Sequence, residues 1–189
     1  MERSFEAVLV EQCATTLAGV KPASLFRYQG ADKRQPREAA ARWAKELAPY
    51  GITIRVLKYC PQTGACLIYL YRAGWLRSIL SEPSTRAFLA GQGYGADQSC
   101  QELLRQLSRR LCLEREFPHE IGLFLSYPPE DVLGFICNRA CNHKCVGCWK
   151  VYGDEQAARS IFEKYEMCSK IYSRQWQQGK SIEQLTVAG

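Results

Sequence analysis

The sequence predicts an α+β fold, in which a small, mainly antiparallel sheet of about three strands is surrounded by about six helices. Two runs rich in β-branched and aromatic residues, 52–57 and 66–71, flank the turn residues Pro61–Gly64 and predict an antiparallel hairpin. Residues 120–127 form a third run that is nearly all apolar, so we expect a buried strand in the same sheet. A helical apolar pattern near the end of the chain predicts a long C-terminal helix.

The helices are expected where a start signal precedes apolar residues at intervals of three or four. Ser4 is expected to cap the first helix, Pro36 to lie in the first turn of the second, and residues 27–36 to form a polar loop before it. Asp97 is expected to cap a later helix, which buries a stripe of leucines: Leu103, Leu104, Leu107 and Leu111. Short helices are expected over 73–80, 84–90 and 129–137, and the long helix begins after Gly153.

The length of 189 residues suits one domain. We expect residues 1–148 to form a single α+β domain that ends in a cysteine-rich loop. Residues 149–189 are expected to form a helical appendage packed on the same domain.

Composition excludes several classes of protein. Apolar residues make up 47% and charged residues 23% of the chain, which excludes wholesale disorder. No run approaches the roughly 18 apolar residues of a membrane span, and the first residues do not form a secretory signal, so we expect a cytoplasmic protein without a membrane partner. The net charge of +6 falls short of the dense basic stripe typical of nucleic-acid binders.

The strongest basic patch consists of Arg105, Arg109, Arg110 and Arg115. Arg105 and Arg109 share one face of a helix because they lie four positions apart. The plain interpretation is a solvated helix face, and the alternative is a surface for a phosphate-bearing partner.

Ten cysteines are present, and four of them, Cys137, Cys141, Cys145 and Cys148, fall within twelve residues. The spacing C-x3-C-x2-C matches radical enzymes that use adenosylmethionine. Those enzymes need a barrel after the motif, whereas 41 residues follow Cys148. A cysteine-rich loop with reduced thiols is a further interpretation.

Zinc is the metal that this cluster fits better, and no other cofactor is indicated. Cys145 and Cys148 have the spacing of a zinc knuckle, and tetrahedral zinc needs two more ligands. The candidates for these are Cys141, His143, Cys137 and the more distant Cys168.

A second candidate site pairs Cys13, on the first helix, with His119, which directly precedes the apolar run 120–127. Papain-like thiol enzymes use this order, because the imidazole takes the proton of the thiol. Asp131 is the first choice for the group that orients the ring, with Asn138 and Asn142 as alternatives. Leu9 and Leu17 are four positions away from Cys13 on either side, which instead favours an inert thiol on the apolar face.

The segments Cys13–Lys21, His119–Pro128 with Glu130–Val132, and Trp149–Asp154 resemble an uncharacterised bacterial family of anaerobic Gram-positive species, the domain of unknown function numbered 3793. The resemblance spans nearly the whole chain. It implies a stand-alone cytoplasmic protein and brings no known activity or functional residue. The family pattern often has tyrosine in place of Cys148, which weakens a family-wide metal site, and glycine in place of Ser126.

Three classes of function therefore stay open. The first is a thiol-dependent hydrolase or transferase built on Cys13 and His119. The second is a zinc-binding or redox module built on Cys141, Cys145 and Cys148. The third is a non-catalytic binding or scaffold protein. The sequence indicates neither a substrate nor a partner.

Overall fold

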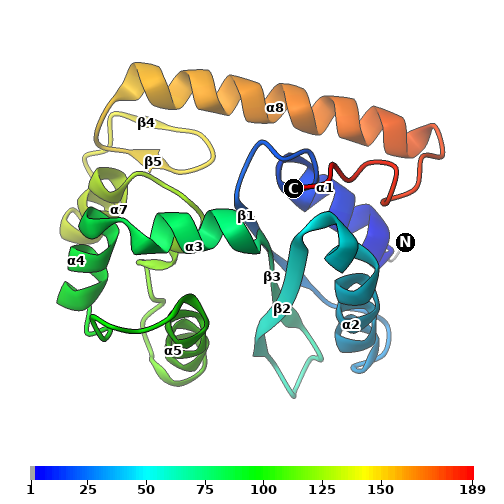
Figure 1. Cartoon of the computed structure of the whole chain (residues 1–189), viewed down its shortest axis with the longest axis horizontal. Helices are drawn as coiled ribbons and strands as arrows, with labels where there is room; N and C mark the ends of the chain where they lie inside the picture. The colour runs from blue at the N-terminus through cyan, green and yellow to red at the C-terminus, as the bar shows by residue number, and fades with distance from the viewer. Residues whose placement is uncertain (1–2) are drawn as a thin grey trace. The chain divides into compact units, whose positions relative to one another are not determined.

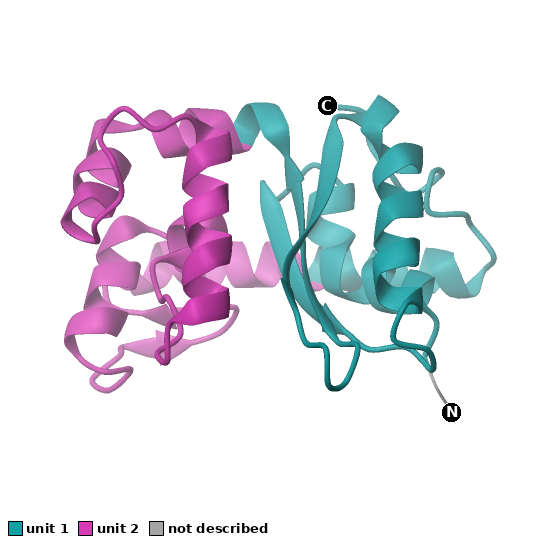
Figure 2. Cartoon of the chain, turned by 90° about the horizontal axis from the view of Figure 1, so that it is seen from below, with its two compact units in different colours: residues 1–75, 167–189 teal, residues 76–166 magenta. Residues whose placement is uncertain are grey.

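The computed structural model describes residues 3–189, and Figure 1 labels its helices and strands in chain order. Contacts between residues divide the chain into two compact units (Figure 2). Unit 1 runs to Trp75 and resumes at Met167–Gly189, and unit 2 is Leu76–Glu166. The helices α3 (Ala73–Ser81) and α8 (Glu155–Gln177) contribute residues to both units. The boundary predicted after Cys148, between the α+β domain and a helical appendage packed on it, stays a prediction.

Unit 1 holds a three-stranded antiparallel sheet with the strand order β1–β3–β2. The strands are β1 (Ala23–Tyr28), β2 (Ile52–Tyr59) and β3 (Cys66–Arg72). β2 and β3 form the predicted hairpin, in which Tyr59 lies opposite Cys66. Its turn requires glycine at Gly64, because φ is +73° and a Cβ would lie 2.5 Å from Lys33 Cα. The predicted α+β fold, with a small antiparallel sheet and a long C-terminal helix, is confirmed.

The prediction of a strand over 120–127 is wrong. Residues Ile121–Phe124 form the short helix α6 in unit 2, and β1 is the third strand of the sheet. Every residue of α6 is buried, and a short apolar run that is buried all round has no periodicity that separates a strand from a helix. A Cβ at Gly122 would lie 2.7 Å from Val132 Cγ2, so this turn packs tightly against α7 (Pro129–Cys137). The polar loop predicted from residue 27 starts too early, because β1 continues to Tyr28.

The other helices largely follow their sequence signals. Ser4 caps α1, since its side chain accepts a hydrogen bond from Ala7 N, and Pro36 lies in the first turn of α2. The cap of α5 is Ser99 and not Asp97. Ser99 and Glu102 form a reciprocal capping box there. The bounds are α1 (Phe5–Leu17), α2 (Gln35–Leu47), the 3-10 turn Ala48–Tyr50, α4 (Pro83–Gly91) and α5 (Cys100–Leu113).

The core of unit 1 lies between the sheet and the helices α1 and α2. α1 packs on β1 and α2 packs on β2, and their apolar side chains form one cluster with Phe26, Ile54, Ile68 and Leu70 of the sheet. Ile182 and Leu185, which follow α8, complete this cluster. Cys13 lies inside it.

In unit 2, a small hairpin joins β4 (Cys145–Val146) to β5 (Lys150–Val151). Trp149 in this hairpin stacks on Tyr127, with ring centroids 4.8 Å apart, and meets the ring of Phe162 edge-on at 4.6 Å. Gly147 packs so closely against the Phe162 ring that a side chain would collide with it. The cysteine-rich segment is therefore built around an aromatic core.

Ser126, which follows α6, adopts the left-handed conformation with φ of +63°. This conformation favours glycine, because glycine has no Cβ to oppose it.

Over the described residues, no helix combines the length and the apolar character that a membrane span requires.

Candidate functional site

Cys13 lies near the middle of α1 and has no exposed surface. Burial raises the pKa of its thiol to about 12, while Lys21 and Ser24 lower it by less. A thiolate is the nucleophilic form of cysteine. At neutral pH the Cys13 thiol is therefore protonated, and its environment suits a packed apolar side chain.

His119 lies in unit 2, in the turn before α6, and is exposed. Its ring contacts those of Phe117 and Phe135, with centroids 5.8 and 4.8 Å away. Because Cys13 belongs to unit 1, their pairing stays a prediction.

Asp131 is 2% exposed and binds the segment that contains Trp149. Its Oδ2 accepts a hydrogen bond from Trp149 Nε1 at 2.7 Å. Its Oδ1 accepts from the backbone N–H groups of Tyr152 at 2.7 Å and Gly153 at 2.8 Å. Three donors are thus satisfied by one buried carboxylate, and Asp131 fixes the β4–β5 hairpin against α7.

The cysteines of the cluster face different surroundings. Cys145 packs against the apolar cluster around Trp149, whereas Cys141 and Cys148 are exposed. Cys168 is buried in unit 1, outside this segment. Among the described residues, no three His, Cys, Asp or Glu side chains gather as a metal site would require. The donor set has the chemistry for zinc, and its arrangement does not form a tetrahedral site.

The loop around Cys141 is strained. Arg139, Ala140 and Asn142 all have positive φ, between 48° and 63°, and Lys150 Nζ holds the loop by donating to the Ala140 carbonyl. Within this part of the chain, His143 Nδ1 is buried without a hydrogen-bond partner, as is the Tyr152 hydroxyl. Such groups mark a place where a further ligand or water would be stabilised.

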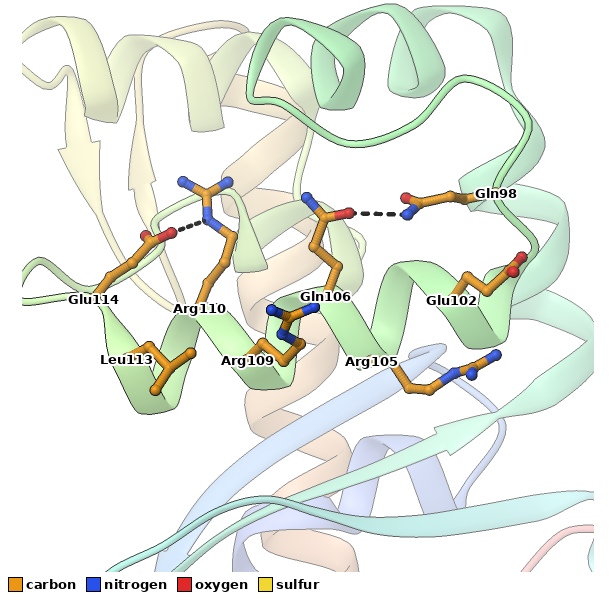
Figure 3. A pocket seen from close by; sticks show the side chains of 8 residues that line it. All are labelled: Gln98, Glu102, Arg105, Gln106, Arg109, Arg110, Leu113 and Glu114. Atoms are coloured by element: carbon orange, nitrogen blue, oxygen red, sulfur yellow. Dashed lines mark hydrogen bonds and ion pairs between the residues drawn. The ribbon is translucent and has the colours of Figure 1, made fainter.

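A hollow of about 580 Å³ runs along α5 in unit 2. We name it the α5 groove; it is open, and eight residues line it: Gln98, Glu102, Arg105, Gln106, Arg109, Arg110, Leu113 and Glu114. Figure 3 shows Gln106 and Arg110 on one flank of α5, where they meet Gln98 and Glu114. The side chains of Arg105, Arg109 and Leu113 lie along the other flank.

Among the described residues, some charged side chains of the groove have an oppositely charged partner and others do not. Arg110 donates to Glu114 at 2.9 Å and to Glu120 at 2.7 Å. The carboxylate of Glu102 is held by Ser99, whose hydrogen bonds lower the pKa of Glu102, with a smaller contribution from Arg105. In the part of the chain that the structure describes, neither Arg105 nor Arg109 forms an ion pair. Two exposed guanidinium groups therefore carry net positive charge.

Sequence reasoning missed the network beneath this groove. Glu120 is 2% exposed and accepts hydrogen bonds from Arg110 and, at 2.9 Å, from the Tyr94 hydroxyl. Burial and then Glu120 raise the pKa of Tyr94. The signal in the sequence that could have revealed the network is Glu120 itself, because it directly precedes an apolar run. A glutamate buried with such a run needs a charged partner.

The model of one protein family, described as "Protein of unknown function (DUF3793)", matches residues 9–186 of the chain. No curated protein and no solved structure matches it.

Proposed function

Because the chain belongs to the DUF3793 family, whose description gives no activity, we propose a function from the side chains of the structure: it is a non-catalytic binding protein that recognises an anionic partner through the α5 groove. One observation carries the proposal. Arg105 and Arg109 are exposed on the same flank of α5, and neither forms an ion pair with any residue that the structure describes.

The placement of Arg105 and Arg109 four positions apart does not stabilise α5. Like charges four positions apart destabilise a helix by about 0.2–0.5 kcal/mol. The acids of the groove relieve this repulsion only in part, since Glu102 is held mainly by Ser99, with a smaller electrostatic contribution from Arg105, and Glu114 binds Arg110. An anion that contacts both guanidinium groups would remove the repulsion and form charge-assisted hydrogen bonds.

A thiol enzyme built on Cys13, His119 and Asp131 has less support. Cys13 is fully buried with a raised pKa, and the hydrogen bonds of Asp131 go to the Trp149 segment. The pairing of thiol and imidazole stays a prediction. Its test is whether His119→Ala slows the alkylation of Cys13.

A zinc or redox module in the cysteine loop is the second candidate. The unpartnered Nδ1 of His143 and the strained residues before it favour this candidate. Zinc would require Cys141, Cys145 and Cys148 to move together, because no tetrahedral arrangement exists among the described side chains. Metal analysis of the purified protein, repeated on Cys145→Ser, tests this candidate: equal metal content in both proteins would contradict it.

The anion-binding proposal is tested with a fluorescein-labelled oligoglutamate, which carries charge and no apolar side chain. Fluorescence anisotropy at low ionic strength measures its dissociation constant. We expect the double variant R105Q/R109Q to weaken binding by at least about tenfold, as expected when charge-assisted contacts are lost. The matched control is Arg77→Gln, which changes an exposed arginine on α3. Equal affinity of the double variant and the wild type would contradict the proposal.

A further inference from the structure

We infer that the partner of the α5 groove is an acidic peptide segment that carries a large apolar side chain next to its carboxylates. This inference rests on the proposed function and names the partner class for the same site. It follows from the order of side chains along one flank of α5. These are Arg105, Arg109 and Leu113, each four positions after the last.

The two arginines define the charged half of the surface. Residues four apart on a helix are separated by about 6 Å along its axis. Guanidinium groups form paired hydrogen bonds with carboxylates. Two acidic side chains of one peptide, on the same face and one helical turn apart, have a matching separation.

Leu113 defines the apolar half. It lines the groove beside the arginines and is 76% exposed, the largest exposed fraction among the exposed large hydrophobic residues of the described chain. A single exposed leucine is ordinary on a protein surface. An exposed leucine in line with two arginines that form no ion pair with a described residue makes a surface with two kinds of contact, one charged and one apolar.

The shape and charge of the groove favour a peptide over other anionic partners. Small ligands bind in concave sites that bury most of their surface, whereas this groove is open. Membrane surfaces are bound by clusters of about four to eight lysines and arginines, and the flank has two. Single-stranded nucleic acid needs aromatic side chains on which bases stack, and the groove lining includes none.

The flank of the groove that carries Gln106 and Arg110 is held in place by hydrogen bonds and ion pairs. Arg110 is fixed on the opposite flank by Glu114 and by the buried Glu120, and Gln106 is fixed by Gln98 and by the Gly93 carbonyl. These side chains form a polar wall that is satisfied within unit 2. Arg105, Arg109 and Leu113 are the side chains of the lining left to contact a partner, with Arg105 Nε also donating to the Gln101 carbonyl of its own helix at 3.4 Å.

The experiment compares three labelled peptides of equal length: one with two glutamates four positions apart and a leucine four positions further, one with that leucine changed to serine, and one with the glutamates changed to glutamine. Anisotropy gives the dissociation constant of each with the wild type, with Leu113→Ser and with R105Q/R109Q. Leu133→Ser is the control, because Leu133 is an exposed apolar residue on α7 of the same unit.

We expect the leucine peptide to bind about tenfold more tightly than its serine counterpart, and Leu113→Ser to abolish that difference. Leu133→Ser should preserve it. If the two acidic peptides bind equally and depend on the arginines, this inference is wrong and the proposed function stands. If no peptide depends on the arginines, both fail. Tighter, arginine-dependent binding of anionic vesicles or of single-stranded RNA than of any peptide would replace the peptide with that partner.

Discussion

The guanidinium of Arg110 and the carboxylate of Glu120 form an ion pair of 2.7 Å beneath the α5 groove. The side chain of Arg110 is 22% exposed and that of Glu120 is 2% exposed, so the two partners are not equivalent. Arg110 also binds Glu114 and the Gln92 carbonyl, whereas Glu120 has Tyr94 as its other side-chain donor.

Removal of Arg110 should therefore cost more stability than removal of Glu120. Arg110→Ala leaves a buried carboxylate without its cation, which costs about 3–5 kcal/mol in the free energy of unfolding. Glu120→Ala leaves the buried Tyr94 hydroxyl without this acceptor, but Arg110 still reaches water and keeps Glu114, so we expect a loss of about 1–3 kcal/mol. Urea unfolding measures both, with Glu114→Ala as a surface control. The reverse order of the two losses would contradict this account.

Asp131 should act on stability through the three donors that it binds. Asp131→Ala leaves Trp149 Nε1 and the backbone N–H groups of Tyr152 and Gly153 without an acceptor. A buried donor left unsatisfied costs about 1–3 kcal/mol. The bond from Trp149 is buried and the two backbone bonds are part-buried, so we expect a loss of at least about 1 kcal/mol. Asp131→Asn keeps an acceptor oxygen and should lose less. Urea unfolding followed by tryptophan fluorescence tests this, and an alanine variant as stable as the wild type would refute it.

Cys13 should make stability fall at high pH. Burial raises the pKa of its thiol from an ordinary value of 9.0 to about 12 in the folded chain, so between these pH values the unfolded chain loses the thiol proton and the folded chain keeps it. The stabilisation is complete below pH 9 and is lost as pH rises toward 12, by about 1.4 kcal/mol per pH unit.

Cys13→Ala removes this titration and leaves the tyrosines as they are. We expect the stability advantage of the wild type over the variant, measured by urea unfolding, to shrink steadily between pH 9 and pH 11. A constant difference across that range would mean that Cys13 ionises equally in both states.

Cys60, in the turn between β2 and β3, should be a reactive thiol. The hydroxyl and backbone N–H of Thr63 are the main causes that lower its pKa, and Arg27 adds a smaller effect. At pH 7, iodoacetamide should alkylate Cys60 several-fold faster in the wild type than in Thr63→Val. Mass spectrometry of the same digests follows Cys137, an exposed cysteine on α7 whose rate should not change. Equal rates for Cys60 in both proteins would exclude the role of Thr63.

The sequence predicts those elements whose formation depends on nearby residues, such as turn glycines, helix caps and apolar runs. The β2–β3 hairpin follows from two apolar runs and a turn with Gly64, and α1 follows from its Ser4 cap. The assignment of 120–127 failed because Ile121–Phe124 is buried on every side, and burial alone does not separate helix from strand. β1 was missed because Arg27 and Tyr28 resemble the polar loop that follows them.

Part of the candidate site is also predictable from the sequence, because it depends on residues close together on one helix. The four-residue spacing of Arg105 and Arg109 reveals their common helix face. Whether they form ion pairs with the other described residues depends on where Glu102 and Glu114 bind, which the sequence does not specify. The contact of Arg110 with Glu120 and Tyr94 joins three separate segments, so only the fold reveals it.

The most direct test of the anion-binding groove follows the arginine side chains themselves by NMR. Titration of labelled protein with the oligoglutamate, recorded on the Nε–Hε signals, reports each guanidinium separately. We expect saturable shifts for Arg105 and Arg109, and no shift for Arg77 on α3. Unmoved signals for Arg105 and Arg109, or equal shifts for all exposed arginines, would contradict it.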